Sequence, residues 1–169
     1  TCALPILHVE GDVNPLRDIE IIETELIYAD ITQLEKKIDR LKKQSKASKE
    51  AAASLVIAED LFKHLEELQP VKTYENQDNE VFIALDKEMR FLSNKDVIYG
   101  ANVDEDSLSD GGNKFVDILK EHAASVGADV IVLCAKIEEE LVGLEDDEAT
   151  EFLADLGVNE SGLEQIIHK

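Results

Sequence analysis

The sequence predicts an α/β protein in which a parallel sheet shares the chain with a long antiparallel pair of helices. In the amino-terminal half, apolar residues repeat at heptad spacing, and a second helix with an apolar stripe follows after a short break. In the carboxyl-terminal half, two β-rich runs flank a helical segment, and this strand–helix–strand order is typical of a parallel sheet.

The predicted helical pair begins at Asn14-Pro15, because Asn caps a helix and Pro at the first helical position loses no needed N–H. Apolar residues at spacings of 4, 3, 4 and 3 then define a heptad seam within residues 15–44: Ile27, Ile31, Leu34, Ile38 and Leu41. A second helix is predicted over residues 49–68. Two such helices joined by a short break predict an antiparallel coiled-coil hairpin.

Residues 71–79 are polar and predict a loop, after which residues 80–92 predict a helix that returns to the sheet. Three further segments give the sheet portion its strand–helix–strand order: strand 97–101, helix 113–126 and strand 129–135. Short helices are predicted at 137–144, 146–156 and 161–168.

Charge is distributed unevenly along the 169 residues, whose net charge is −21. Residues 103–169 contain eighteen acids and four bases, whereas residues 36–49 contain seven bases and one acid. The chain as a whole therefore repels nucleic acid, but one end of the predicted hairpin attracts it. No apolar run approaches 18 residues, so no membrane span is predicted.

Residues 97–105 (VIYGANVDE) carry the most specific motif. An apolar run ends on Asn102, followed by Val103 and, two positions on, Glu105. P-loop nucleotide-binding domains present their base-reading tetrapeptide at such a strand end, and guanine-specific domains use Asn-Lys-x-Asp there. Here Val103 replaces the Lys and Glu105 the Asp, and the extra methylene displaces the carboxylate that would accept from guanine. The substitution argues against guanine and permits adenine.

Four segments in order resemble the YchF subfamily of Obg-like ATPases, which are GTPase-type P-loop ATPases of the TRAFAC class. They are HVEGDVNP at 8–15, DIEIIETEL at 18–26, ANVDED at 101–106 and VLCAKIE at 132–138. The resemblance implies a Ras-like P-loop G domain interrupted by a helical coiled-coil insertion and followed by a TGS domain. It further implies a cytoplasmic protein that prefers ATP to GTP, uses Mg²⁺ with its nucleotide and associates with ribosomes, with the large subunit as the expected partner.

The resemblance divides the chain into expected parts. Residues 7–14 would end the first part of the G domain, residues 15–92 would form the insertion and its return helix, and residues 93–169 would form the base-recognition half. We expect residues 1–6 to be non-native, because one reading frame of a common sequencing adapter encodes them; the alternative is a divergent amino terminus. No G-x-x-x-x-G-K-[ST] loop occurs, so we expect this chain to be a fragment that does not hydrolyse nucleotide by itself.

By this resemblance Asn102 would hold the base loop, Val103 would lie against adenine and Glu105 would set the base preference. Cys134-Ala135-Lys136 matches the second base-contacting loop, usually Ser-Ala-Lys. The alternative for residues 102–105 is an ordinary Asn- and Asp-rich turn at the end of the first strand. The alternative for residues 134–136 is a merely structural end of the second strand.

Cys134, the one cysteine outside residues 1–6, fits a reducing cytosol and is either redox-sensitive or an inert apolar residue. The sequence shows no metal-ligand spacing.

The basic end of the hairpin is a candidate contact for ribosomal RNA phosphates, and a merely solvated helix face is the alternative. Its residues are Lys36, Lys37, Arg40, Lys42, Lys43, Lys46 and Lys49. We therefore expect the parent protein to be an ATP-binding and ATP-hydrolysing protein associated with the ribosome. Two alternatives remain: a non-catalytic module whose ribosome or RNA binding is switched by nucleotide, and a GTPase of the Obg group.

Overall fold

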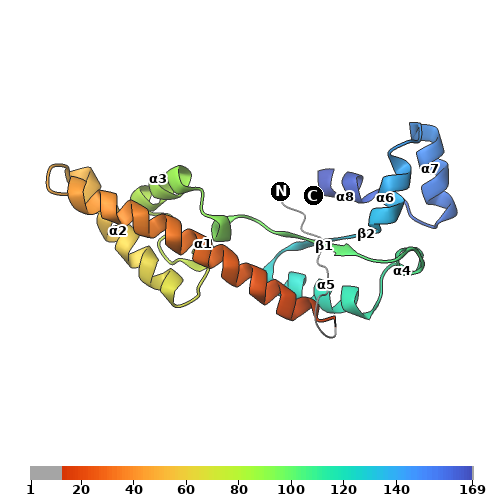
Figure 1. Ribbon diagram of the computed structural model, residues 1–169, viewed down its shortest axis with the longest axis horizontal. Helices are drawn as coiled ribbons and strands as arrows, with labels where there is room; N and C mark the ends of the chain where they lie inside the picture. Colours follow the sequence, from red (N-terminus) through yellow and green to blue (C-terminus); the bar gives the residue numbers. More distant parts are fainter. Residues whose placement is uncertain (1–12, 169) are drawn as a thin grey trace. The chain divides into compact units, whose positions relative to one another are not determined.

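The computed structural model describes residues 13–168, which form a helix-rich α/β structure with a two-stranded parallel sheet (Figure 1). The chain divides into two compact units: Asp18–Lys95, and residues 96–168 together with 13–17. The α/β class expected from the sequence is confirmed. The expectations for residues 1–6, and for most of residues 7–14, lie outside the described residues. No helix within the described part is long and apolar enough to cross a membrane.

Helix α1 spans Pro15–Gln44, the range predicted from its cap and heptad pattern. The side chain of Asn14 accepts a hydrogen bond from the backbone N–H of Arg17 at 3.2 Å, as expected of a capping Asn. A short turn leads to α2 (Lys49–Glu66), which runs in the opposite direction (Figure 1). The Ser48 side chain caps α2 by accepting from the N–H of Ala51 at 3.2 Å.

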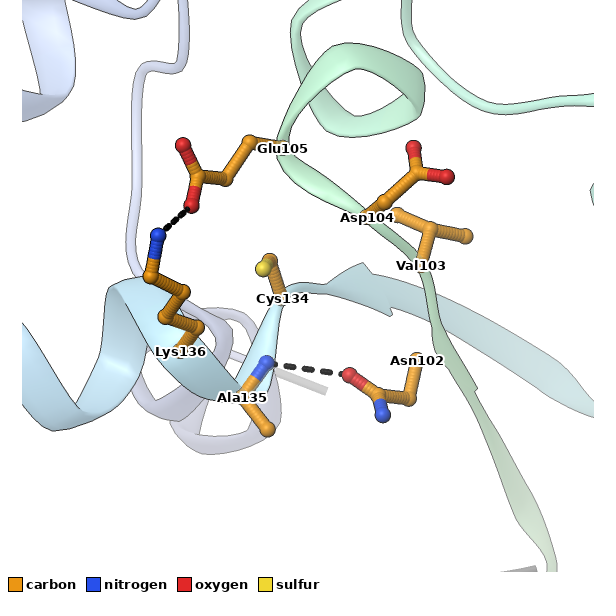
Figure 2. A pocket seen from close by; sticks show the side chains of 7 residues that line it. All are labelled: Asn102, Val103, Asp104, Glu105, Cys134, Ala135 and Lys136. Atoms are coloured by element: carbon orange, nitrogen blue, oxygen red, sulfur yellow. Dashed lines mark hydrogen bonds and ion pairs between the residues drawn. The ribbon is translucent and has the colours of Figure 1, made fainter.

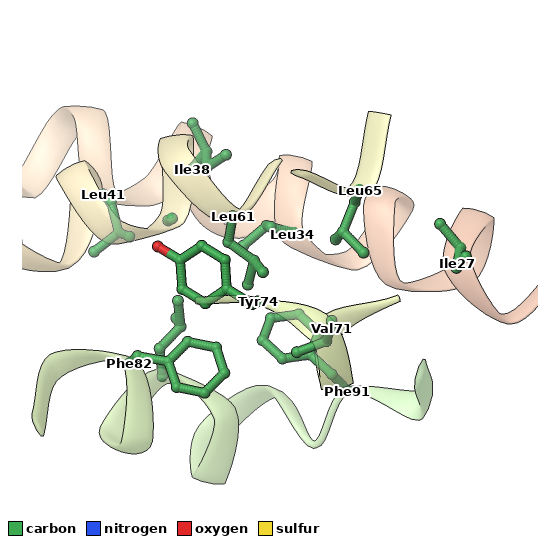
Figure 3. Close-up of a cluster of buried hydrophobic side chains, with 12 residues drawn as sticks. Ile27, Leu34, Ile38, Leu41, Leu61, Leu65, Val71, Tyr74, Phe82 and Phe91 are labelled. Atoms are coloured by element: carbon green, nitrogen blue, oxygen red, sulfur yellow. The ribbon is translucent and has the colours of Figure 1, made fainter. Parts of the chain in front are cut away.

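Apolar side chains from both helices and from residues 71–91 form one core (Figure 3). Leu34, Leu61 and Leu65 are fully buried in it, and so is Val71, in a short 3₁₀ turn at Val71–Thr73 within the expected loop. Helix α3 (Glu80–Met89) contributes Phe82 and Leu85 to the same core. The helical pair therefore has one face covered by the segment that follows it.

Asp30 is the one buried charged residue in the described part of the chain, and it anchors the end of this segment on α1. Its carboxylate accepts from the backbone N–H groups of Leu92 and Ser93, both at 2.8 Å, and from the Ser93 hydroxyl at 2.7 Å. The helix predicted for residues 80–92 ends at Met89, because Arg90 takes a left-handed φ of 55° and the N–H groups beyond it turn toward Asp30.

In the second unit, strands β1 (Ile98–Asn102) and β2 (Asp129–Leu133) pair in parallel, with Asn102 opposite Leu133. The connection contains α5 (Lys114–Val126), which packs on both strands and has Val116, Leu119 and Ala123 buried. It also contains α4 (Glu105–Ser109), which the sequence did not predict.

Three short helices follow β2: α6 (Ala135–Leu141), α7 (Asp146–Asp155) and α8 (Gly162–Ile167). Helix α6 begins two residues earlier than predicted, directly after the strand. Helix α8 lies against β2, where the Gln165 side chain donates to the Val132 carbonyl at 3.2 Å. Gly162 permits this approach, since a Cβ there would lie 2.8 Å from the Cβ of Leu133.

We expect Asp30→Ala to lower the free energy of unfolding by about 3 kcal/mol, because it strands two backbone donors that a buried carboxylate now satisfies. Urea denaturation followed by circular dichroism measures the loss. Asp39→Ala on the exposed side of the same helix is the matched control and should change stability by less than about 0.5 kcal/mol. Equal losses in the two variants would contradict this role for Asp30.

Candidate functional site

A pocket of about 250 Å³ opens where the carboxyl ends of β1 and β2 meet (Figure 2). Parallel pairing in register brings the residues after Asn102 beside the residues after Leu133, thirty-one positions later in the chain. Seven residues line the pocket: Asn102, Val103, Asp104, Glu105, Cys134, Ala135 and Lys136. All of them except Asp104 were predicted from the sequence. The two motif loops identified separately in the sequence therefore form one concavity.

The Asn102 side chain ties the two loops together. Its oxygen Oδ1 accepts a hydrogen bond from the backbone N–H of Ala135 at 2.9 Å (Figure 2). Just beyond the strand, the Val103 N–H donates to the Leu133 carbonyl at 2.9 Å and extends the ladder by one residue. Because a backbone N–H can only donate, the oxygen of Asn102 faces Ala135, and its NH₂ group, a donor, is the end left for a ligand.

Glu105 forms an ion pair with Lys136 across the mouth of the pocket (Figure 2). The hydrogen bond to Glu105, and then its negative charge, raise the pKa of Lys136 above the ordinary lysine value. Both side chains are partly exposed, at 42% for Glu105 and 66% for Lys136. The sequence placed both residues at the site but did not predict that they pair, because the contact depends on the register between the strands and on side-chain rotamers.

Asp104 lines the pocket and was not among the predicted site residues. It is the N-cap of α4, and its carboxylate accepts from the backbone N–H of Ser107 at 2.8 Å. Hydrogen bonds with the Ser107 side chain and backbone lower the pKa of the Asp104 carboxyl. An Asp ahead of a short helix is a recognisable capping signal, and it could have predicted both α4 and this role.

Cys134 lies at the N-cap position of α6 and is buried, with only 4% of its surface exposed. Its neighbours in the core are Ile137 and Leu153. This environment favours the interpretation of Cys134 as a small apolar residue at the base of the pocket.

Within residues 13–168, no three His, Cys, Asp or Glu side chains are placed to hold a metal ion.

The candidate RNA-contacting bases lie in the unit Asp18–Lys95 and differ in their surroundings. Lys37 donates to both carboxylate oxygens of Glu88, at 2.6 and 2.7 Å, and Lys42 lies 3.5 Å from Glu59. These two bases are already engaged by acids. The remaining five are exposed: Lys36, Arg40 and Lys43 on α1, Lys46 in the turn and Lys49 at the start of α2.

Comparison with known proteins gives a consistent set of relatives. The chain is 42% identical over 164 residues to the ribosome-binding ATPase YchF of Bacillus subtilis, and 40% and 37% identical over 163 residues to the proteins of that name from Haemophilus influenzae and Escherichia coli O157:H7. Each match covers 96% of this chain and 44% of the relative. The chain thus spans less than half the length of these relatives. No family model matches it.

A solved structure described as the YchF GTPase of Schizosaccharomyces pombe superimposes with a TM-score of 0.74 at 31% sequence identity. The match covers 96% of this chain and 45% of that protein. The resemblance inferred from the motifs is therefore confirmed in sequence and in fold. The relatives carry two descriptions, ATPase and GTPase, so base preference has to be argued from this chain's own residues.

We expect Glu105→Gln to lower the pKa of Lys136, because the substitution removes the charge that holds the ammonium in its protonated form. NMR titration of the Lys136 side chain measures the change, and Asp104→Asn, whose carboxyl faces Ser107 instead, is the control. Because the pKa of Lys136 is raised in the folded state, the pair makes its full contribution to stability at any pH below the ordinary lysine pKa of 10.5. That contribution is lost as the pH rises through the raised pKa. An unchanged Lys136 pKa in Glu105→Gln would contradict the pairing.

Proposed function

We propose that this chain, which belongs to the YchF family, supplies the base-recognition pocket and a coiled-coil insertion of a P-loop G domain that binds and hydrolyses ATP in association with the ribosome. The observation that carries the proposal is the convergence of the two motif loops on one pocket, tied by the Asn102–Ala135 hydrogen bond. At about 250 Å³, the pocket is slightly smaller than the roughly 300–1,000 Å³ of typical small-molecule sites. It suits one flat part of a ligand, such as a base.

The polar groups around the pocket favour adenine over guanine. Guanine recognition by the related tetrapeptide requires a free carboxylate that accepts from the ring N–H and the exocyclic amine. Glu105 is longer than the Asp of that motif, and its carboxylate is held by Lys136. Bringing it to a guanine edge would require breaking this exposed pair, which adds a cost of at most about 1 kcal/mol that adenine does not incur. Val103 then offers an apolar surface to the base.

The phosphates and Mg²⁺ would be bound by residues other than those lining this pocket. We propose that Mg²⁺ accompanies ATP in the whole protein, where it would neutralise charge that develops on the transferred phosphoryl group. The part of the chain described here contributes the base end of the site through Asn102, Val103 and Lys136. Positioning the base in this way would orient the rest of the nucleotide for hydrolysis.

Two other functions remain as alternatives. A non-catalytic module would bind ATP through the same pocket and use occupancy only to switch ribosome or RNA binding. A GTPase of the Obg group would have to accept guanine in this pocket; the S. pombe structure is described as that of a YchF GTPase. Turnover of ATP and GTP by the whole protein, with and without ribosomes, separates the three functions.

We further propose that α1 and α2 form the coiled-coil insertion, expected at residues 15–92. Support comes from the burial of seam residues Ile27, Leu34, Ile38 and Leu41 in one core with Ala58, Leu61 and Leu65 of α2, and from the compact unit Asp18–Lys95. Heptad seams pack in this way because a and d side chains from facing helices interlock.

We propose that the exposed bases near the turn between α1 and α2 contact RNA. The large ribosomal subunit as partner and a cytoplasmic location are also proposals, and they rest on the family resemblance. Lys36, Arg40 and Lys43 are spaced by four and three residues, so they form one stripe on α1. They are free of the acids that engage Lys37 and Lys42. Such a stripe can neutralise several phosphates at once.

We expect Val103→Lys combined with Glu105→Asp, introduced into the whole protein, to shift nucleotide preference toward GTP by about 1–3 kcal/mol. The shorter carboxylate returns to reach of guanine and the restored Lys resembles the guanine-specific tetrapeptide. Competition binding with ATP and GTP measures the change, and Asp104→Glu, which alters the neighbouring capping residue, is the control. An unchanged affinity ratio in the double variant would show that Glu105 does not discriminate between the bases.

We expect the triple variant Arg40→Glu, Lys43→Glu and Lys46→Glu to reduce co-sedimentation of the whole protein with ribosomes at near-physiological salt, while nucleotide binding is retained. The matched control reverses three exposed bases elsewhere: Lys87→Glu, Lys95→Glu and Lys120→Glu. Counterion release makes the lost binding salt-dependent. Sedimentation of the triple variant equal to that of the control at every salt concentration would show that the basic end is only solvated.

A further inference from the structure

A groove of about 500 Å³ runs between α1 and α2, and the proposed ATPase function does not use it. From α1 it is lined by Glu35, Ile38, Asp39 and Lys42, and from α2 by Glu59, Phe62, Lys63 and Glu66. Each set has the spacing i, i+3, i+4, i+7, which places its members along one stripe of the helix. The groove is therefore a continuous feature about two helical turns long, or about 10 Å.

The floor of the groove is apolar. Ile38 is only 6% exposed, and Phe62 is half-buried against the core of the unit. Figure 3 shows Ile38 directed away from the ring of Tyr74, whereas Leu34 and Leu61 are directed toward it. No residue of the following segment lines the groove, so Phe62 offers its half-exposed ring to another molecule there, and the nearly buried Ile38 closes the floor beside it.

The rims of the groove are negative. Four carboxylates and two ammonium groups line it, and one of each is paired, since Lys42 lies 3.5 Å from Glu59. Glu35, Asp39 and Glu66 then face a single remaining base, Lys63. This sign is opposite to that of the neighbouring stripe Lys36, Arg40 and Lys43, which occupies a different side of α1.

We propose that this groove binds a basic amphipathic helix of a partner protein. Apolar side chains of the helix would sit on Ile38 and Phe62, and its Lys or Arg side chains would pair with Glu35, Asp39 and Glu66. Helix-in-groove recognition uses anchors at i, i+3, i+4 and i+7, and these match the length and spacing of both walls. Nucleic acid does not fit, because its phosphates would meet three unpaired carboxylates.

The test uses the 169-residue chain and a fluorescein-labelled 14-residue peptide of leucine and lysine, with the leucines at i, i+3, i+4 and i+7. Fluorescence anisotropy measures the affinity. Neutralising the rim with Glu35→Gln, Asp39→Asn and Glu66→Gln should weaken binding at least about fivefold, because three charge pairs are lost. The matched control, Glu20→Gln, Glu25→Gln and Glu75→Gln, removes the same charge from exposed positions outside the groove and should change affinity less than about twofold.

A scrambled peptide of the same composition tests whether the apolar floor matters. It should bind at least about fivefold more weakly than the ordered peptide, because its leucines cannot share one face. Equal binding of the two peptides, or equal weakening by the rim and control variants, would overturn the proposal and leave only general attraction to an acidic chain. Displacement of the peptide by a short duplex RNA would also overturn it.

NMR of the unsubstituted chain gives a reading that does not depend on the folding of any variant. Addition of the ordered peptide should shift the side-chain signals of Ile38 and Phe62, which line the groove. The signals of Val103 and Ala135, in the pocket of the other unit, should stay in place. Shifts confined to residues outside the groove would overturn the proposal even if the peptide binds.

Discussion

The parallel, in-register pairing of β1 with β2 is the constraint on which the candidate site depends. Residues after Asn102 and residues after Leu133 have no local reason to meet, and they do so because parallel strands end at the same edge of a sheet. The hydrogen bond from Ala135 N–H to Asn102 then holds the two loops at a set separation. A register shift of one residue would turn Asn102 to the other face of the strand and would break this link.

The helical unit has a corresponding anchor in Asp30. A buried carboxylate is tolerable only when hydrogen bonds replace its water, and Asp30 receives three, from Leu92 and Ser93. These contacts join positions more than sixty residues apart and direct the return segment onto α1. The apolar core formed by Leu34, Leu61 and Phe82 supplies the burial, while Asp30 determines where the segment ends.

Charge is sorted within α1 more finely than along the sequence. Lys37 and Lys42 belong to the same basic run as Lys43, yet one is held by Glu88 and the other by Glu59. A helix separates neighbours in sequence by about 100° around its axis, so a single run supplies an ion pair to α3, a rim to the groove and an exposed basic stripe. One side of α1 can therefore bind phosphates, while another side can bind a basic helix.

The sequence by itself determined the elements whose signals are local. The bounds of α1 follow from the Asn14 cap and the heptad pattern, and the position of β1 follows from an apolar run that ends on Asn102. Six of the seven pocket residues were predicted because each motif carries its own residue types at a strand end. The hydrogen-bond partners were not predicted, since the Glu105–Lys136 ion pair depends on the register of the two strands.

Only the tertiary structure decided which polar residues are buried or paired. Asp30 lies one position before the seam residue Ile31, and nothing in its neighbourhood in the sequence distinguishes it from an exposed acid such as Asp39. Its burial arises because residues 92 and 93 return to α1 from far along the chain. Local patterns specify helices, strands and caps, whereas partners distant in sequence are selected by how those elements pack.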